Sequence, residues 1–275
     1  MKLSFTTLAC PGWDISKIVD AAVASRYDAI DFRGYLDAVE IVESRSFKGR
    51  ALREIASRVM DAGLEVSCLS SGARMTARDK ADRECELDKM RRYAELCGAF
   101  GCRQVRIFGG AVEGVADPVA SAAETLATAS EIARDAGIVL AVETHDDWSN
   151  TTMLRSALRA AGDPDGIGLL WDLQHPWFAA GEKPDVSARN LAGKLCNTHW
   201  KDMRRMPDGG FHLCLVGKGE LPLHAVFTSL RSIGYEGWAT LEWEKRWHPD
   251  IEEPEIAIPA FAEFFRELAR KPATM

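Results

Sequence analysis

The chain has 275 residues, of which 34 are basic and 41 acidic, so its formal net charge is −7. Hydrophobic residues make up 47% and charged residues 27%. This ordinary globular balance excludes a disordered tail, a collagen-like repeat and a disulfide-rich miniprotein. The acidity argues against nucleic acid or an anionic membrane as the main partner. Because no linker or composition shift divides the chain, residues 1–275 are predicted to form a single domain.

The seven cysteines give an odd number and contain no CxxC pair. This pattern does not indicate a disulfide framework and predicts a reducing, cytoplasmic location. No stretch approaches the ~20 apolar residues that a membrane span requires, so no membrane partner is expected.

Short apolar runs alternate with amphipathic stretches eight times along the chain. The apolar runs predict strands at residues 2–8, 29–32, 64–69, 104–108, 138–142, 167–171, 195–200 and 238–243. The amphipathic stretches predict helices at 15–25, around 52–59, 87–97, 118–136, 152–161, 184–191, 222–233 and 261–268. Eight strand–helix units with continuously apolar strands predict an α/β fold, a (β/α)8 TIM barrel. A doubly wound open sheet is the alternative, but the GxGxxG turn typical of dinucleotide-binding sheets does not follow the first strand.

In a TIM barrel the active site lies at the C-terminal ends of the strands. The side chains at the last four strand ends are Glu143 with His145, Asp172 with His175, His199 with Lys201 and Asp202, and Glu242 with Glu244. Carboxylates with imidazole suit Mn²⁺, Mg²⁺, Co²⁺ or Zn²⁺. Burying Asp172 and Glu242 after apolar runs is costly without a cation or another partner. We therefore predict that these residues form one shared divalent-metal site. The alternative is that each is a hydrogen-bonded structural residue or a solvated charge at the rim of the barrel.

Alternation along a strand narrows the choice of ligands. Glu143 and His145 share one face, and so do Glu242 and Glu244. The residue nearer the barrel has the better claim as a ligand, which favours Glu143 and Glu242. His145 and Glu244 are then candidates to support the site or face the substrate, with rim hydrogen bonding as the alternative.

The chain resembles the xylose-isomerase-like TIM-barrel superfamily, the sugar phosphate isomerases and epimerases, over essentially its whole length. In that family a metal is held by Glu, Asp, His and Glu from successive strands, which matches Glu143, Asp172, His199 and Glu242. The family's Asp-x-x-His and HxKD patterns match residues 172–175 and 199–202. The segments VGKGELPL and GYEGWATLEWE resemble its C-terminal pattern.

The resemblance implies a divalent-metal-dependent isomerase or epimerase that acts on a ketose or related sugar, with Mn²⁺ as the expected ion. Glu143 and Glu242 would be catalytic, moving a proton through a metal-stabilised enediolate. His175 and Arg205 would bind substrate, together with His145 and Lys201. A sugar or polyol is the expected small-molecule partner, and a homo-oligomer is possible.

One departure keeps other functions open. Ketose 3-epimerases carry an extra Glu where this chain has Ser149. A metal-dependent dehydratase of an inosose or similar keto-polyol is therefore an alternative, and a non-catalytic carbohydrate-binding barrel is another.

Three weaker features also lie near the predicted strand ends. Arg33 and Arg106 either point into the barrel mouth or form salt bridges with Asp31 or Glu40. Gly217 and Gly219 are a candidate phosphate-binding nest. The tryptophans in or beside the loops are candidate walls of a small-molecule pocket, namely Trp13, Trp148, Trp177 and Trp200.

Overall fold

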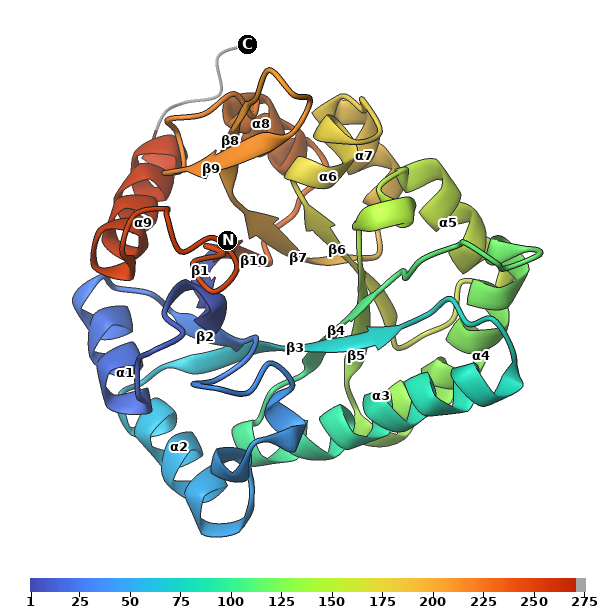
Figure 1. Cartoon of the computed structure of the whole chain (residues 1–275), viewed down its shortest axis with the longest axis horizontal. Helices are drawn as coiled ribbons and strands as arrows, with labels where there is room; N and C mark the ends of the chain where they lie inside the picture. The colour runs from blue at the N-terminus through green and yellow to red at the C-terminus, as the bar shows by residue number, and fades with distance from the viewer. Residues whose placement is uncertain (271–275) are drawn as a thin grey trace.

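A computed structural model describes residues 1–270 of the chain. Eight parallel strands close into a barrel, in the order β1-β10-β7-β6-β5-β4-β3-β2. Helices form an outer ring around these strands (Figure 1). The barrel strands are β1 (Lys2–Thr6), β2 (Ala29–Phe32), β3 (Glu65–Arg74), β4 (Gln104–Phe108), β5 (Val139–Glu143), β6 (Ile167–Asp172), β7 (Leu195–Trp200) and β10 (Trp238–Leu241). The predicted TIM barrel is confirmed.

The helices follow the strands in chain order. They are α1 (Ile15–Ala24), α2 (Gly49–Asp61), α3 (Lys80–Phe100), α4 (Pro118–Ala136), α5 (Thr151–Ala160), α6 (Gln174–Phe178), α7 (Pro184–Leu191), α8 (Leu223–Ser232) and α9 (Pro254–Arg270). None of the helices in residues 1–270 is both long and apolar enough to cross a membrane.

Helix α4 shows how local sequence sets an element's ends. The Asp117 side chain accepts a hydrogen bond from the Ala120 N–H at 3.0 Å, and Pro118 occupies the first turn, where its missing N–H costs nothing. Gly137 ends the helix with φ +66°, a conformation that glycine adopts without a Cβ penalty. These signals explain why the predicted range 118–136 matches the helix.

Two elements were not predicted from the sequence. The short helix α6 directly follows β6, and an antiparallel hairpin of β8 (Asp202–Arg205) and β9 (Phe211–Cys214) follows β7. Strand boundaries also shift, because β3 continues to Arg74 and β10 ends at Leu241. Both additions lie between a barrel strand and its helix, where connections carry function and vary most.

The main core lies between the barrel and the helix ring, and β7 illustrates how it is built. Successive side chains of a strand face opposite sides. His199 faces the barrel interior, and Trp200 faces outward against α9, with ring centroids 6.2 Å from Phe261 and 5.3 Å from Phe265. The apolar neighbour of each functional side chain thus anchors the strand, while the functional side chain itself points inward.

Candidate active site

Four metal-competent side chains meet at the C-terminal mouth of the barrel. Glu143 ends β5, Asp172 ends β6, His199 lies in β7 and Glu242 directly follows β10. Each offers one ligand atom, and these atoms lie within 4.8 Å of one another. All four side chains are buried. The structure thus brings together the four residues predicted as ligands, which we call the acidic cluster.

His199 lies between the carboxylates of this cluster. Its Nδ1 is 2.7 Å from Glu143 Oε1 and 3.3 Å from Glu242 Oε1. Burial favours the neutral ring, but the charges of Glu242 and Glu143 outweigh it and raise the pKa of His199 well above its usual value. The imidazole therefore carries a proton here that a metal ion would have to displace.

The donor set of the cluster fits a divalent metal ion. Three carboxylates and one imidazole are the ligands that Mn²⁺, Mg²⁺, Co²⁺ and Zn²⁺ accept. Glu143 Oε2 and Asp172 Oδ2 are buried and make no hydrogen bond among the described residues, although Arg106 Nε and Lys201 Nζ lie 3.3 and 2.9 Å from them. These two cations compensate part of the charge of the three carboxylates, and a metal ion in place of the His199 proton would supply further positive charge.

Asp31 in β2 lies on the far side of the His199 ring. Its Oδ2 is 3.5 Å from His199 Nε2 and accepts a hydrogen bond from Ser70 Oγ at 3.1 Å. A carboxylate on the second nitrogen of a metal-binding histidine fixes its tautomer and ring orientation. The sequence analysis considered Asp31 only as an arginine partner. The only signal for another role was a carboxylate inside the otherwise apolar run AIDF.

Lys201 contributes a positive charge to the same mouth. Its Nζ is 2.6 Å from Glu242 Oε2 and 2.9 Å from Asp172 Oδ2, and it also pairs with Glu244. Burial favours the neutral amine, yet the charges of Asp172, Glu242 and Glu244 raise the pKa of Lys201 well above its usual value. The ammonium group therefore neutralises part of the buried negative charge.

Arg106 supports Glu143 from the neighbouring strand. Its Nε lies 3.3 Å from Glu143 Oε2, and each side chain is only 1% exposed. Burial alone would raise the pKa of Glu143, but the charges of Arg106 and His199 lower it to about 2. Glu143 is thus held ionised at neutral pH.

Asp172 positions the short helix α6 and with it His175. Its Oδ1 accepts hydrogen bonds from the N–H groups of Gln174 at 2.8 Å and His175 at 3.3 Å. The His175 ring lies beside His145 at a tilt of 49°, with centroids 4.1 Å apart, and its Nε2 is 3.9 Å from Asp172 Oδ2. Burial lowers the pKa of His175, whereas for His145 the charges of Asp146, 2.8 Å away, and Glu143 overcome burial and raise the pKa. The Asp-x-x-His spacing therefore places His175 beside the cluster, next to His145.

A pocket of about 330 Å³ opens above the cluster. Its lining combines acidic, basic and apolar side chains: Leu8, Arg33, Arg106, Phe108, His145, Glu242, Glu244 and Trp247. Trp247 was missed in the sequence analysis because it follows the last strand by several residues. Of the tryptophans considered there, Trp148 and Trp200 are fully buried. Glu242 is the member of the acidic cluster that lines the pocket.

Arg205 lies apart from this pocket lining. It belongs to β8, its side chain is exposed, and its guanidinium lies over the rings of Trp177 and Phe178, 4.6 and 5.1 Å from their centroids. The structure therefore places it against α6 and not in the acidic cluster. Its role in substrate binding stays a prediction.

The glycine turn after β9 does not form a free phosphate nest. The N–H groups of Gly217 and Gly219 donate to Asp202 Oδ2 at 2.9 and 2.8 Å. A Cβ at Gly219 would collide with the same carboxylate. The phosphate interpretation was wrong, because Asp202 of the HxKD pattern already binds these donors and holds the turn against β8.

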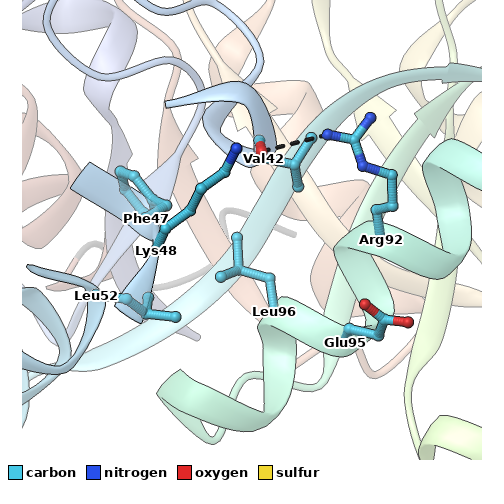
Figure 2. A pocket seen from close by; sticks show the side chains of 7 residues that line it. All are labelled: Val42, Phe47, Lys48, Leu52, Arg92, Glu95 and Leu96. Carbon is cyan, nitrogen blue, oxygen red and sulfur yellow. Dashed lines mark hydrogen bonds between the residues drawn. The ribbon is translucent and has the colours of Figure 1, made fainter. Parts of the chain in front are cut away.

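A separate pocket of about 370 Å³ lies outside the barrel, between α2 and α3 (Figure 2). In it, Arg92 donates a hydrogen bond to the Val42 carbonyl at 3.3 Å above the apolar side chains of Phe47, Leu52 and Leu96. None of its lining residues belongs to the acidic cluster. The chemistry-bearing residues are therefore concentrated at the barrel mouth.

The closed parallel barrel and the buried cluster at its C-terminal mouth define a TIM barrel with a metal-competent site. The chain belongs to the xylose isomerase-like TIM barrel family, whose model matches residues 19–268. A curated relative, the uncharacterized protein YihM of Escherichia coli (strain K12), is 25% identical over 137 residues. That match covers 49% of this chain and 41% of the relative, so it spans less than half of the relative's length.

Solved structures show the same fold. The IOLI protein with a bound zinc atom has a TM-score of 0.81 and 19% identity, with 100% of both chains covered. The probable 3-DHS dehydratase AsbF from Bacillus anthracis has a TM-score of 0.79 and 16% identity, covering 97% of this chain and 99% of that one. An L-ribulose 3-epimerase has a TM-score of 0.76 and 18% identity, covering 100% and 99%. Structural relatives of this chain thus include an epimerase and a dehydratase.

Proposed function

We propose that this protein is a divalent-metal-dependent isomerase or epimerase that acts on a ketose or related sugar. The observation that carries the proposal is the buried cluster of Glu143, Asp172, His199 and Glu242 beneath an open pocket. Mn²⁺ is the expected ion, and Mg²⁺, Co²⁺ and Zn²⁺ suit the same donors. A sugar of this kind offers adjacent hydroxyl and carbonyl oxygens, which can both bind a metal ion held by carboxylates.

The first chemical step would be removal of a proton next to the substrate carbonyl. A divalent ion held by the cluster would supply Lewis acidity, polarising that carbonyl and stabilising the charge that develops. Glu242 is the first candidate for the base because it alone of the cluster lines the pocket. Burial would raise the pKa of Glu242, but Lys201 and His199 lower it well below its usual value, so the carboxylate is ionised. A carboxylate with a strongly lowered pKa is a weak base, so Glu242 would accept a proton once substrate draws one of these partners away.

Glu143 is the candidate for the second carboxylate, which would return a proton to the other face or to the adjacent carbon. Its low pKa of about 2 makes it a weak base while Arg106 and His199 contact it. Because Glu143 is ionised, it has no proton to return until substrate draws one of these partners away and the carboxylate takes up a proton from water in the pocket. Lys201, His145 and His175 would hold substrate oxygens near the cluster, and Arg205 would do so from β8, beside α6.

A dehydratase is the second candidate, and the neighbouring His145 and His175 rings favour it. Dehydration shares the same proton removal but then expels a β-hydroxyl group, which needs an acid to protonate it. The raised pKa of His145 makes its imidazolium a suitable proton donor at the pocket wall. A non-catalytic carbohydrate-binding barrel would have no need for this donor, nor for a base that lines the pocket.

Mass spectrometry of turnover in D₂O tests these alternatives. Ketoses, inososes and hydroxypyruvate would be incubated with the Mn²⁺-loaded protein. An isomerase or epimerase returns a sugar of unchanged composition with deuterium at the carbon next to the carbonyl. A dehydratase gives a product lighter by one water, which would reject the isomerase. A strict requirement for a nucleotide cofactor, without deuterium uptake, would reject both.

The seven cysteines of the chain are free in the structure. They fit the expected reducing compartment, and the cytoplasmic location is proposed on that basis.

A further inference from the structure

Two nearly buried arginines line one side of the pocket. Arg33 follows β2 and Arg106 lies in β4, with 9% and 1% of each residue exposed. Both guanidinium groups lie over the ring of Phe108, with Cζ 6.0 Å (Arg33) and 3.8 Å (Arg106) from its centroid. Their positive charges thus lie together in a pocket that Glu242 and Glu244 also line.

Each guanidinium keeps hydrogen-bond donors that the protein does not use. Arg33 donates through Nη1 to the Val39 carbonyl at 3.2 Å and to Glu40 Oε1 at 3.0 Å. Arg106 donates through Nη1 to the Ser71 carbonyl at 2.7 Å, and its buried Nε lies 3.3 Å from Glu143 Oε2, so its other Nη donors are the ones left for a ligand. A guanidinium has five N–H donors, so donors remain for a ligand.

The position of Arg33 is held by its carboxylate partner. Glu40 Oε2 accepts hydrogen bonds from the Tyr93 hydroxyl at 2.8 Å and from the Gly72 N–H at 3.2 Å. A Cβ at residue 72 would collide with the Glu40 carboxylate, so only glycine leaves room for it. The arginine is therefore fixed from behind, as expected for a preorganised binding group.

The two arginines also affect each other. Burial and the charge of Arg106 lower the pKa of Arg33, although Glu40 opposes this. Arg106 is paired with Glu143, which also contacts His199. Two buried cations in one pocket attract an anion, and planar guanidinium groups bind carboxylate or phosphate through paired hydrogen bonds.

We propose that Arg33 and Arg106 form an oxyanion-binding subsite, so that the substrate is a hydroxyketone with a carboxylate or phosphate at the end that meets these arginines. This inference rests on the proposed function in that the hydroxyketone end would meet the acidic cluster. Arg33 is then a specificity-determining residue that contacts the anionic group.

Three small ligands that share a hydroxyketone test the proposal. Dihydroxyacetone is neutral, hydroxypyruvate carries a carboxylate and dihydroxyacetone phosphate carries a phosphate. Calorimetric titration of the Mn²⁺-loaded wild-type protein should give at least one anion an affinity ~10-fold or more above that of dihydroxyacetone, because charge-assisted hydrogen bonds are strong. The tighter of the two anions identifies the natural group. Equal affinity for all three would overturn the proposal without any variant.

Arg33→Gln provides the second measurement, with the exposed Arg50→Gln as matched control. In Arg33→Gln, the ratio of anion affinity to dihydroxyacetone affinity should fall ~10-fold, while the affinity for dihydroxyacetone stays within about twofold of wild type. Arg50→Gln should behave as wild type. An undiminished advantage in a folded Arg33→Gln protein would overturn the proposal. Inorganic phosphate titrated into metal-free protein separates the two hypotheses. If the wild-type protein binds phosphate and Arg33→Gln does not, the subsite is supported. This conclusion holds even if dihydroxyacetone shows no metal-dependent binding, because that result would count against the proposed function alone.

Discussion

The two sides of the barrel mouth differ in the charge that they present. The side formed by β5, β6, β7 and β10 presents the carboxylates of the acidic cluster. The side formed by β2 and β4 presents Arg33 and Arg106, together with the carboxylate of Asp31 behind His199. Both sets of charges are buried, so each needs partners to offset the loss of water. The acidic side suits a cation, and the basic side suits an anion. One small pocket would therefore have two binding functions.

The two sides are joined through Glu143. Its carboxylate contacts His199 within the acidic cluster and Arg106 on the basic side. A change at either side is therefore expected to reach the other through this residue, since interacting buried charges are rarely additive. The predictions below separate the two sides, from the largest expected effect to the smallest.

Loss of a ligand should abolish metal binding by the acidic side. We expect His199→Ala and Asp172→Asn each to lower metal affinity by more than ~100-fold. Loss of a residue that only supports a ligand costs ~10- to 100-fold, and loss of the ligand itself should cost more. Metal content after dialysis, measured by mass spectrometry, checks this. The exposed Asp185→Asn serves as control and should keep its metal. Full metal content in both cluster variants would show that the ligand assignment is wrong.

Glu242→Gln should separate metal binding from proton transfer. The amide keeps an oxygen donor but cannot act as a base, so we expect partial metal retention and turnover reduced at least ~10²-fold. Steady-state kinetics with an active substrate, alongside metal analysis, measures both. Glu244→Gln removes the neighbouring carboxylate from the same pocket and should cost less. Wild-type turnover by Glu242→Gln would remove this residue from the mechanism.

Asp31 should tune the metal site from behind His199. We expect Asp31→Ala to weaken metal binding ~10- to 100-fold, as loss of a partner of a metal-binding histidine does. Asp31→Asn keeps an acceptor oxygen and should restore part of the affinity. Calorimetric titration with Mn²⁺ measures the metal affinity of each variant, and thermal melting of the metal-free variants measures their stability. A loss of metal affinity without a matching loss of stability distinguishes a positioning role from a purely structural one. Equal metal affinity in Asp31→Ala and wild type would refute the positioning role.

Glu40 should affect stability on the basic side with a defined pH dependence. Burial raises its pKa, but Arg33 and the hydrogen bonds from Tyr93 and Gly72 lower it overall. A depressed carboxyl pKa stabilises the fold above the unfolded-state value and loses this contribution as the pH falls through the folded one. We expect Glu40→Gln to lower the free energy of unfolding by about 1–3 kcal/mol at pH 7, and the difference from wild type to shrink below about pH 4.

Urea unfolding of both proteins at pH 7 and at pH 3.5 to 4 measures this difference. Glu54→Gln, which removes an exposed partner of Arg50, controls for the loss of a surface ion pair. A pH-independent difference between Glu40→Gln and wild type would show that packing, and not the charge of Glu40, matters.

Sequence by itself determined the barrel and the place of the acidic cluster. Eight apolar runs of strand length, separated by amphipathic stretches, leave few ways to bury their surface other than a closed parallel barrel. Since all parallel strands then end at one mouth, Glu143, Asp172, His199 and Glu242 had to meet there. Alternation along each strand favours Glu143 and Glu242 as ligands, and the family resemblance completes the set with Asp172 and His199.

Only the tertiary structure decided which partner each buried charge has. His199 and Glu143 are 56 residues apart, and Asp31 is farther still, so no local pattern shows that one ring contacts both carboxylates. Asp202 fills the glycine turn that otherwise resembles a phosphate nest, and Arg205 lies against α6. Periodicity specifies the face on which a side chain lies, whereas its contacts depend on strand register and on connections such as α6 and the β8–β9 hairpin. The pairing of charges in the mouth therefore follows from packing in three dimensions.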